Sequence, residues 1–487
     1  MTEPIYGEVA SAGASRISAT ALADLLGYWS ASGGALYQML ASRISRLADT
    51  AGLPPGIRLP PERELAAVLS VSRNTVATAY QILRDEGMAE SRRGSGTRIA
   101  PHRITPAAVH RANGFFARVL QDAEVRINLT LAAVDCAPQV AAALDDPASV
   151  LDRAARREIT SGTGYFPYGV PSLRTAIAAM LTTRHGLPAR TPEVLITTGA
   201  QQALDLLIRR EVMPGRPVIA EDPTFPGALD ALHRSGARLV GVRPGDVERL
   251  ERAIAAHRPG LVYLIPTYQN PVGSSLPLSA REQVVALAAA NPDVVFIDDM
   301  TLADVTLSDS TPPPPLAALA PDLPNIVTIG SLSKTHWAGL RIGWIRAPEG
   351  ILAGLAAAKS AADLGSSAYH QAIAAELVAG QYDQIVKWRT DWLRPRYAAI
   401  DGALRAHLPA CTWTPPEGGL TIWARLPGDA DSEPFTQAAL RRGIAMVPGR
   451  LLSVADDATD ATSYVRIAYT RPPDQLTAAI ETLAGIL

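Results

Sequence analysis

The apolar positions of the first hundred residues follow the spacing of short helices. Between residues 36 and 47 they recur every three or four positions, as on one helical face. Two further helices are expected over residues 62–69 and 73–86, with Ser72 as N-cap of the second. Their expected buried positions are Leu65, Val68, Leu69, Val76, Tyr80 and Leu83. Only three residues separate these two helices, and residues 88–99 read as two short strands, so the segment is typical of a helix-turn-helix with a wing.

The pattern changes after residue 126. Apolar runs of strand length then alternate with Ala- and Leu-rich helical stretches; examples are VLITTG, PVIAED, LVYLIPT, VVFIDD and NIVTIG. Such alternation indicates a parallel sheet with helices on both faces, an α/β fold. We therefore expect a leader over residues 1–34, a winged helix over 35–100, a proline-containing linker over 101–126, and an α/β unit over 127–487.

Composition narrows the class of protein. A hydrophobic content of 47% with 19% charged residues is typical of a folded globular chain, and 487 residues exceed one ordinary core. The net charge of −2 provides no overall attraction to nucleic acid or membranes. Two cysteines cannot form a disulfide framework or a metal site. Without a signal-peptide pattern or an apolar span, we expect a cytoplasmic protein that uses neither a metal nor a membrane.

Lysine is rare in this chain. Of 45 basic residues only Lys334, Lys359 and Lys387 are lysines. An arginine keeps its charge and cannot form an imine, whereas a lysine amine can. The bias favours a chemical role for a lysine, although chance alone could also leave three.

Several predicted strand ends carry groups suited to a phosphorylated aldehyde. Gly199, Ala200 and Gln201 lie where a strand turns into a helix, and backbone N–H groups at a helix start favour a phosphate. Asp298 ends a buried strand, where a carboxylate could keep a pyridine nitrogen protonated. Taken alone, the glycine turn is more often an ordinary strand-to-helix turn, and a carboxylate at a strand end is about as often a solvated turn or a helix cap.

The segment SLSK is the strongest of these signals. It places Ser331, Ser333 and Lys334 at a strand end, and Arg341 follows seven residues after the lysine. Hydroxyls and an arginine beside an amine suit a phosphate-bearing aldehyde held as a Schiff base. Two further groups are the amide of Asn270, for a phenolate, and the ring of Phe225, for stacking; alone, Phe225 is more typical of a core residue than of a stacking ring.

In this order the motifs resemble those of the fold-type I aminotransferases. The matching residues are Gly199, Phe225, Asn270, Asp298, Ser331 to Lys334, and Arg341. The resemblance implies large and small domains, pyridoxal 5'-phosphate on Lys334, and a homodimer with sites at its interface. It also implies that Tyr165 reaches the neighbour's phosphate and that Arg466 clamps a substrate carboxylate. Many relatives have a tyrosine at the position of Met300, and a methionine cannot donate a hydrogen bond to the cofactor phenolate, which favours a sensor over an efficient enzyme.

The first hundred residues carry a second resemblance. LPPERELAAVLSVSRNTVATAYQILRDEGMAESRRGSGTRI resembles the GntR-type winged helix. The resemblance implies contacts with a double-stranded DNA operator from Arg63, Ser72, Arg73, Asn74, Thr75, Arg93 and Gly94. Arg73 is the candidate for a bidentate guanine contact, since the first turn of a recognition helix meets base edges.

Together the two halves resemble the MocR subfamily of GntR regulators. That resemblance implies a transcription regulator that senses an amino compound or pyridoxal 5'-phosphate itself, as a homodimer for which domain-swapped pairing is expected. The alternatives are a catalytically active aminotransferase with an accessory N-terminal domain, and a purely structural interaction module in which both motifs are degenerate. Sustained turnover would separate the enzyme from the regulator.

Overall fold

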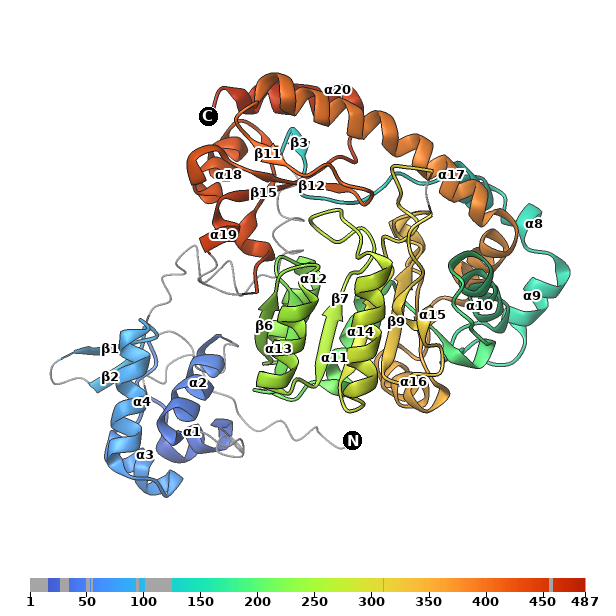
Figure 1. Cartoon of the computed structure of the whole chain (residues 1–487). Helices are drawn as coiled ribbons and strands as arrows, with labels where there is room; N and C mark the ends of the chain where they lie inside the picture. Colours follow the sequence, from blue (N-terminus) through green and yellow to red (C-terminus); the bar gives the residue numbers. More distant parts are fainter. Residues whose placement is uncertain are drawn as a thin grey trace. The chain divides into compact units, whose positions relative to one another are not determined.

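The computed structural model describes residues 16–26, 35–49, 53, 56–92, 96–100, 125–309, 311–454 and 459–486. The chain divides into two compact units, Met1–Ala112 and Asn113–Leu487, and each has its own buried core (Figure 1). Residues 101–124, most of the predicted linker, lie outside the described residues. No helix in the described ranges is both long enough and apolar enough to cross a membrane.

The first unit contains the predicted helices and wing. Its described elements are α1 (Ala19–Leu26), α2 (Leu36–Asp49), α3 (Glu62–Leu69), α4 (Arg73–Asp85), β1 (Ala89–Arg92) and β2 (Gly96–Ile99). The two strands pair antiparallel, with Ala89 opposite Ile99. The helix-turn-helix and the two-stranded wing expected from the sequence are therefore confirmed.

The core of this unit departs from expectation at two places. Val68 was expected to be buried but is 43% exposed. Because two residues turn a helix by about 200°, Val68 points away from the buried Ala66. Helix α1, in the segment assigned to a leader, packs into the same core through Leu22 and Leu26.

Two hydrogen bonds hold the start of α4 in place. The Ser72 hydroxyl oxygen accepts the Thr75 N–H at 3.0 Å, which confirms the predicted N-cap. The buried Tyr80 hydroxyl donates to the Pro60 carbonyl at 2.9 Å and so ties the middle of α4 to the segment before α3. The first turn of α4 is thereby presented at the surface in a defined orientation.

The second unit is built on a seven-stranded sheet with the order β4-β10-β9-β8-β7-β5-β6. The strands are β4 (Val194–Thr197), β5 (Pro217–Glu221), β6 (Arg238–Val242), β7 (Leu261–Leu264), β8 (Val295–Asp299), β9 (Ile326–Ser331) and β10 (Gly343–Arg346). Strand β10 runs antiparallel to both neighbours, and the remaining pairs are parallel. The predicted parallel sheet is confirmed apart from β10.

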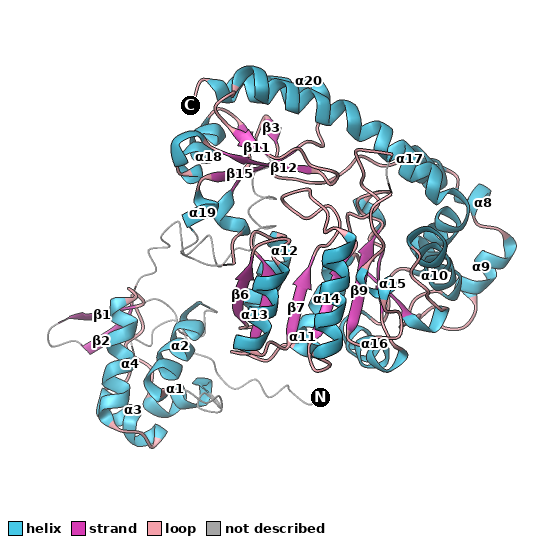
Figure 2. Ribbon diagram, viewed as in Figure 1, coloured by secondary structure: helices cyan, strands magenta, loops and turns pink. Residues whose placement is uncertain are grey.

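Helices cover both faces of this sheet (Figure 2). The first face packs against α11 (Ala200–Glu211), α12 (Pro226–Arg234) and α16 (Glu349–Asp363). The second face packs against α10 (Pro171–His185), α13 (Val247–His257), α14 (Leu278–Ala290), α15 (Leu316–Leu319) and the first half of α17 (Ala368–His407). Successive strand residues point to opposite faces, so Phe296 joins the second core and Ile297 the first.

A smaller sheet lies beyond the large one. Its order is β11 (Thr412–Trp413), β12 (Thr421–Arg425), β15 (Tyr464–Ala468) and β14 (Val447–Pro448), and it shares a core with α18 (Ser432–Arg441), α20 (Pro473–Ala484) and the second half of α17. The long helix α17 runs from beside α10 to beside α20 (Figure 1). Strand β3 (Ile127–Asn128) pairs in parallel with β13 (Ile444–Ala445), which joins the start of this unit to its end.

The remaining described elements are short. Helices α7 (Pro138–Asp145), α8 (Pro147–Val150) and α9 (Arg153–Thr160) precede α10, and α19 (Thr459–Thr462) precedes β15. Single 3-10 turns cover Thr191–Glu193, Ala338–Leu340, Pro427–Asp429 and Gly449–Leu452.

Because the strands of the large sheet other than β10 are parallel, their carboxyl ends lie at the same edge of the sheet. Ligands of such sheets bind at this edge.

Candidate functional site

Lys334 lies in the turn that follows β9. Its Nζ donates to the Ala132 carbonyl at 2.6 Å. Burial, together with repulsion from Arg466 and Arg341 and against attraction to Asp299, lowers the pKa of this amine to about 8. A larger fraction of the amine is therefore uncharged near neutral pH than for a lysine in water, which suits attack on an aldehyde.

The two predicted serines shape this turn. The Ser331 hydroxyl lies 2.9 Å from the Ser333 hydroxyl and 3.0 Å from the Ile342 carbonyl oxygen, and the Ser333 N–H donates to Ser331 Oγ at 3.1 Å. Both side chains are buried. The hydroxyls therefore fix the turn that presents Lys334.

Arg341 and the start of α11 come together as the sequence predicted. Arg341 Nη2 donates to the Thr198 carbonyl at 2.6 Å, and Ala200 begins α11 directly after Gly199. Gly199 has φ 81°, and a Cβ there would lie 2.9 Å from Arg341 Nη2. A side chain at this position would displace the guanidinium, so the turn requires glycine for both conformation and space.

Phe225 and Gln201 meet across Gly227. A Cβ on Gly227 would lie 2.5 Å from both Gln201 Oε1 and Phe225 Cζ, and Gln201 Nε2 donates to the Gly227 carbonyl at 2.8 Å. Phe225 is the residue before the first turn of α12, on the face of the sheet that also carries α11. The predicted stacking ring and the predicted phosphate turn are therefore neighbours.

The two aspartates at the end of β8 point to opposite faces. Asp298 accepts the Leu316 N–H at 2.7 Å on the second face, and burial raises its pKa to about 6. Asp299 accepts the Tyr263 hydroxyl and the Thr301 N–H, at 2.7 and 2.8 Å. Burial raises the pKa of Asp299, and attraction to Lys334 acts in the opposite direction. Asp299 therefore interacts electrostatically with Lys334, while the role predicted for Asp298, as partner of a pyridine nitrogen, stays a prediction.

Polar atoms at the carboxyl edge of the large sheet indicate whether a ligand fits there. Within the described residues, Gln201 Oε1, Thr224 Oγ1 and Asn270 Oδ1 are buried without a hydrogen-bond partner. A buried polar group without a partner costs about 1–3 kcal/mol, so such groups mark a place for a polar ligand. The Thr224 hydroxyl can donate, and a 180° rotation of the Asn270 amide presents its NH₂ group. Donors for a phenolate, a turn for a phosphate and an amine with a lowered pKa therefore fit pyridoxal 5'-phosphate.

Arg466 and Tyr165 occupy contrasting environments. Arg466, on β15, is 2% exposed, and its Nη2 donates to the Thr130 carbonyl at 2.6 Å. Lys334 contacts the same segment at Ala132, so the two cations lie along one stretch of backbone. Tyr165, in the turn after α9, is 62% exposed. Its predicted contact needs a second copy of the chain and stays a prediction.

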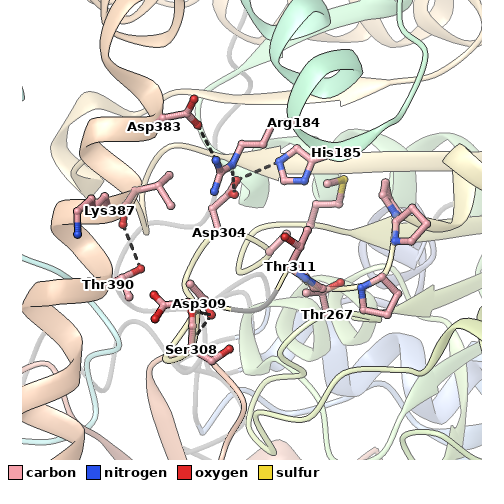
Figure 3. Close-up of a pocket in the computed structure, with 18 of the residues that line it drawn as sticks. Arg184, His185, Thr267, Asp304, Ser308, Asp309, Thr311, Asp383, Lys387 and Thr390 are labelled. Carbon is pink, nitrogen blue, oxygen red and sulfur yellow. Dashed lines mark hydrogen bonds and ion pairs between the residues drawn. The ribbon is translucent and has the colours of Figure 1, made fainter.

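Met300 lines a cavity of about 450 Å³ on the second face (Figure 3). In its wall, Asp304 accepts a hydrogen bond from Arg184 Nε at 2.6 Å and lies 3.0 Å from His185 Nε2. Asp304 also accepts a hydrogen bond from the Tyr382 hydroxyl at 2.7 Å. The interactions with His185 and Arg184 outweigh the effect of burial and hold the pKa of Asp304 well below its usual range. Met300 contributes only apolar surface and a thioether here, so it supplies no hydrogen-bond donor.

Four polar residues of this edge escaped the sequence analysis: Glu221, Thr224, Tyr263 and Gln269. Glu221 accepts the Ile265 N–H at 3.0 Å and Gln269 Nε2 at 3.2 Å, and burial raises its pKa to about 8. It thus holds the loop that leads to Asn270. In the sequence, the glutamate of PVIAED is indistinguishable from a residue of a solvated turn, so the sequence contains no signal that identifies Glu221.

The predicted DNA contacts lie in the first unit. Ser72, Arg73 and Asn74 are exposed at the start of α4, Thr75 is half-buried beside them, and Arg63 is exposed on α3. Glu62 accepts Arg73 Nε at 3.2 Å and so steadies one edge of the guanidinium. Arg93 and Gly94 lie outside the described residues.

Comparison with known proteins connects both units to families. The family described as aminotransferase class I and II matches residues 133–483, and the one described as bacterial regulatory proteins, gntR family, matches residues 36–99. Aromatic-amino-acid aminotransferase 1 of Thermococcus litoralis is 30% identical over 337 residues, 67% of this chain and 79% of that protein. The uncharacterized HTH-type transcriptional regulator YisV of Bacillus subtilis is 29% identical over 442 residues, 85% of this chain and 88% of that protein.

The fold also occurs in a solved aminotransferase. The structure of Pyrococcus horikoshii kynurenine aminotransferase, in complex with PMP as well as its substrates and products, aligns with a TM-score of 0.69 and 25% identity. The alignment covers 83% of this chain and 98% of that chain. The aminotransferase is therefore matched almost whole.

The buried Glu221 predicts a pH-dependent stability. Its folded pKa of about 8 lies above the ordinary 4.5, so folded protein holds a proton that unfolded protein releases between these values. This group's contribution to stability therefore falls as pH rises from about 4.5 to about 8. Glu221→Gln should lose less stability than the parent protein between pH 5 and 8, by on the order of 1 kcal/mol or more, in urea unfolding. The exposed Glu349→Gln is the control, and an equal slope in all three proteins would contradict the assignment.

The lowered pKa of Lys334 predicts how pyridoxal 5'-phosphate is captured. Because only the uncharged amine attacks an aldehyde, the rate of covalent capture should rise with pH and level off above about 8. Stopped-flow absorbance measures the rate, and borohydride reduction with mass spectrometry locates the attachment. Lys334→Ala should abolish attachment and Lys387→Ala, at an exposed lysine, should not. Attachment that persists in Lys334→Ala would refute the role of this amine.

Proposed function

The chain belongs to the aminotransferase class I and II family and carries a GntR-family domain ahead of it, and from this we propose a pyridoxal 5'-phosphate-dependent, DNA-binding transcription regulator. One observation carries the proposal. The same chain has an exposed start of the recognition helix α4 and, at the carboxyl edge of the large sheet, a group of polar residues around Lys334. The similarity to a protein named as an HTH-type regulator extends over 85% of the chain and so spans both units.

Residues at the carboxyl edge of the large sheet are proposed to bind different parts of the cofactor. Bound pyridoxal 5'-phosphate supplies an aldehyde that bonds amines and a ring that withdraws electrons. Lys334 would hold the aldehyde carbon, and Asn270 would donate to the phenolate. The phosphate would be bound by Ala200, Gln201, Ser331, Ser333 and Arg341. Phe225 would cover the ring, Asp298 would be the partner of the ring nitrogen, and Asp299 influences the charge of Lys334.

The effector is proposed to be an amino compound, or the cofactor itself. An incoming amine would meet the cofactor at Lys334, and a carboxylate on the same molecule would meet Arg466, whose planar fork suits bidentate binding. Both cations contact the segment at Thr130 and Ala132, so one small molecule can reach both positions. An effector with both groups fits these residues better than a simple amine.

The regulator is proposed to act as a homodimer. Tyr165 is exposed, as a residue must be to reach a second subunit's phosphate, and domain-swapped pairing follows the expectation for the MocR subfamily. Effector binding changes DNA affinity only if the two states of the dimer bind the effector with different affinity. Two α4 helices on one duplex would also double the contact with DNA.

An active aminotransferase is the second candidate. The observation in its favour is that the lysine, arginines and aspartates of the site are all present, as expected from 30% identity with an aromatic-amino-acid aminotransferase. Against efficient turnover stands Met300, which leaves the phenolate one donor short of many relatives.

DNA binding provides the first test of the regulator. The full-length protein should bind DNA from upstream of its own gene in preference to random DNA, with an affinity that falls steeply with salt and responds to pyridoxal 5'-phosphate. Arg73→Ala should weaken specific binding by about 10- to 100-fold, the range for a lost bidentate guanine contact. Arg84→Ala is the control, since this arginine lies later in α4 and bonds to Gln81. Fluorescence anisotropy across a salt series measures both, and equal losses in the two variants would contradict the role of Arg73.

Turnover provides the second test. We expect mixing of the holoprotein with amino acids to change its cofactor spectrum at most once per site, because regulation requires binding and not a catalytic cycle. Keto-acid formation in the presence of excess amino acid and a keto-acid acceptor measures this. Sustained formation over many turnovers, together with no preference for upstream DNA, would establish the enzyme in place of the regulator.

A further inference from the structure

Lys359 is the most deeply buried of the three lysines. It lies on α16, its side chain is 0% exposed, and its Nζ lies 3.0 and 3.3 Å from the two carboxylate oxygens of Asp363. The pair Lys387–Asp391 has the same spacing of four residues, but its side chains are 78% and 52% exposed. An exposed pair of this kind contributes little to stability, whereas burying an ammonium group is costly unless its partner is well placed.

Asp363 connects this lysine to the start of α11. Gln202 Nε2 donates to Asp363 Oδ2 at 2.8 Å, and Gln202 Oε1 accepts the Thr198 N–H at 2.8 Å. The carbonyl of the same Thr198 accepts Arg341 Nη2 at 2.6 Å. Both backbone polar groups of Thr198 are therefore held by side chains, immediately before Gly199.

The direction of the Gln202 amide follows from Asp363. An ionised carboxylate only accepts hydrogen bonds, so the NH₂ group of Gln202 must face it and the amide oxygen must face Thr198. The hydrogen bonds from Gln202 and Lys359 lower the pKa of Asp363 against the effect of burial, which keeps the carboxylate ionised. The carboxylate also accepts the Gly365 N–H at 2.9 Å, which holds it at the end of α16.

We propose that Lys359, Asp363 and Gln202 form a positioning relay that sets the phosphate-binding turn at Thr198 and Gly199 and, through it, Arg341. The proposal rests on the proposed function, because it assumes that the phosphate of pyridoxal 5'-phosphate occupies this turn. The relay contacts the backbone of the turn and not the cofactor. It therefore acts by orienting the N–H groups at the start of α11 and the guanidinium of Arg341. Lys359 has a second effect: its charge offsets the carboxylate of Asp363, which would otherwise repel a phosphate.

A phosphate-selective loss of affinity distinguishes this role from general support of the fold. Dissociation constants of pyridoxal 5'-phosphate and of pyridoxal, which lacks the phosphate, are measured by absorbance titration of the full-length apoprotein. Asp363→Ala and Lys359→Met should each weaken pyridoxal 5'-phosphate by about tenfold, the size of one lost charge-assisted hydrogen bond, and leave pyridoxal within about twofold. Lys387→Met, which breaks the exposed pair of equal spacing, should change neither.

Two combinations test the order of the relay. Lys359→Met with Asp363→Asn should recover most of the affinity, because an asparagine oxygen still accepts from Gln202 and carries no charge. In a double-mutant cycle, Asp363→Ala should add nothing to the loss caused by Gln202→Ala, since it acts through that amide. The ³¹P chemical shift of the bound cofactor should move in Asp363→Ala and stay unchanged in Lys387→Met.

The possible outcomes separate the relay from the proposed function. Equal losses for both ligands, or additive losses in the cycle, would overturn the relay and make the pair a structural one. The thermal midpoint of unfolding is recorded for each variant. If the single variants are unfolded, the two dissociation constants are compared between the parent protein and the double variant Lys359→Met with Asp363→Asn. If the parent protein binds neither ligand, the proposed function fails first; if it binds both and every variant matches it, only the relay fails.

Discussion

A lysine amine can capture an aldehyde only while it is uncharged, and the edge of the large sheet is arranged around that requirement. Burial and the repulsion of Arg466 and Arg341 favour loss of the proton from Lys334, while Asp299 restrains it. The buried hydroxyls of Ser331 and Ser333 hold the turn in which the amine lies. The neighbouring elements supply the charges that act on the Lys334 amine. Strand β15 carries Arg466, Arg341 lies just before β10, and β8 ends in the two aspartates.

The strand alternation explains why two adjacent carboxylates differ. Asp298 and Asp299 share a strand and are both buried, yet one accepts a helix N–H beside α15 and the other a tyrosine hydroxyl on the face of α11. Their different partners give them different couplings to Lys334. Met300, next in the chain, turns back to the second face and lines the cavity beside Asp304. A regulator can tolerate such a residue, because binding an effector needs the site's shape and charges but not the fastest proton transfers.

The first unit meets a separate requirement, the presentation of a helix start. The Ser72 cap and the Tyr80 hydrogen bond fix α4 from within the unit, so its geometry does not depend on the cofactor domain. A net charge of −2 for the whole chain is compatible with DNA binding because the arginines that matter are local to α3 and α4. The regulatory and cofactor-binding tasks are therefore divided between two cores, with the sequence of residues 101–126 between them.

Local pattern was sufficient for most of the elements, because helix spacing, strand-length apolar runs and turn chemistry are properties of short segments. It found the helix-turn-helix, the wing and the parallel sheet, but not α1 or the antiparallel direction of β10. The glycine turn and Arg341 lie together as the motif order suggested. Local pattern could not find the direction of a side chain at a strand end, so it did not show that Asp299, on the other face from Asp298, interacts electrostatically with Lys334. Nor could it find Glu221, Tyr263 or the Lys359–Asp363–Gln202 chain, whose members are far apart in sequence and ordinary in isolation. Their chemistry comes from burial and from neighbours on other elements, and these exist only once the chain has folded.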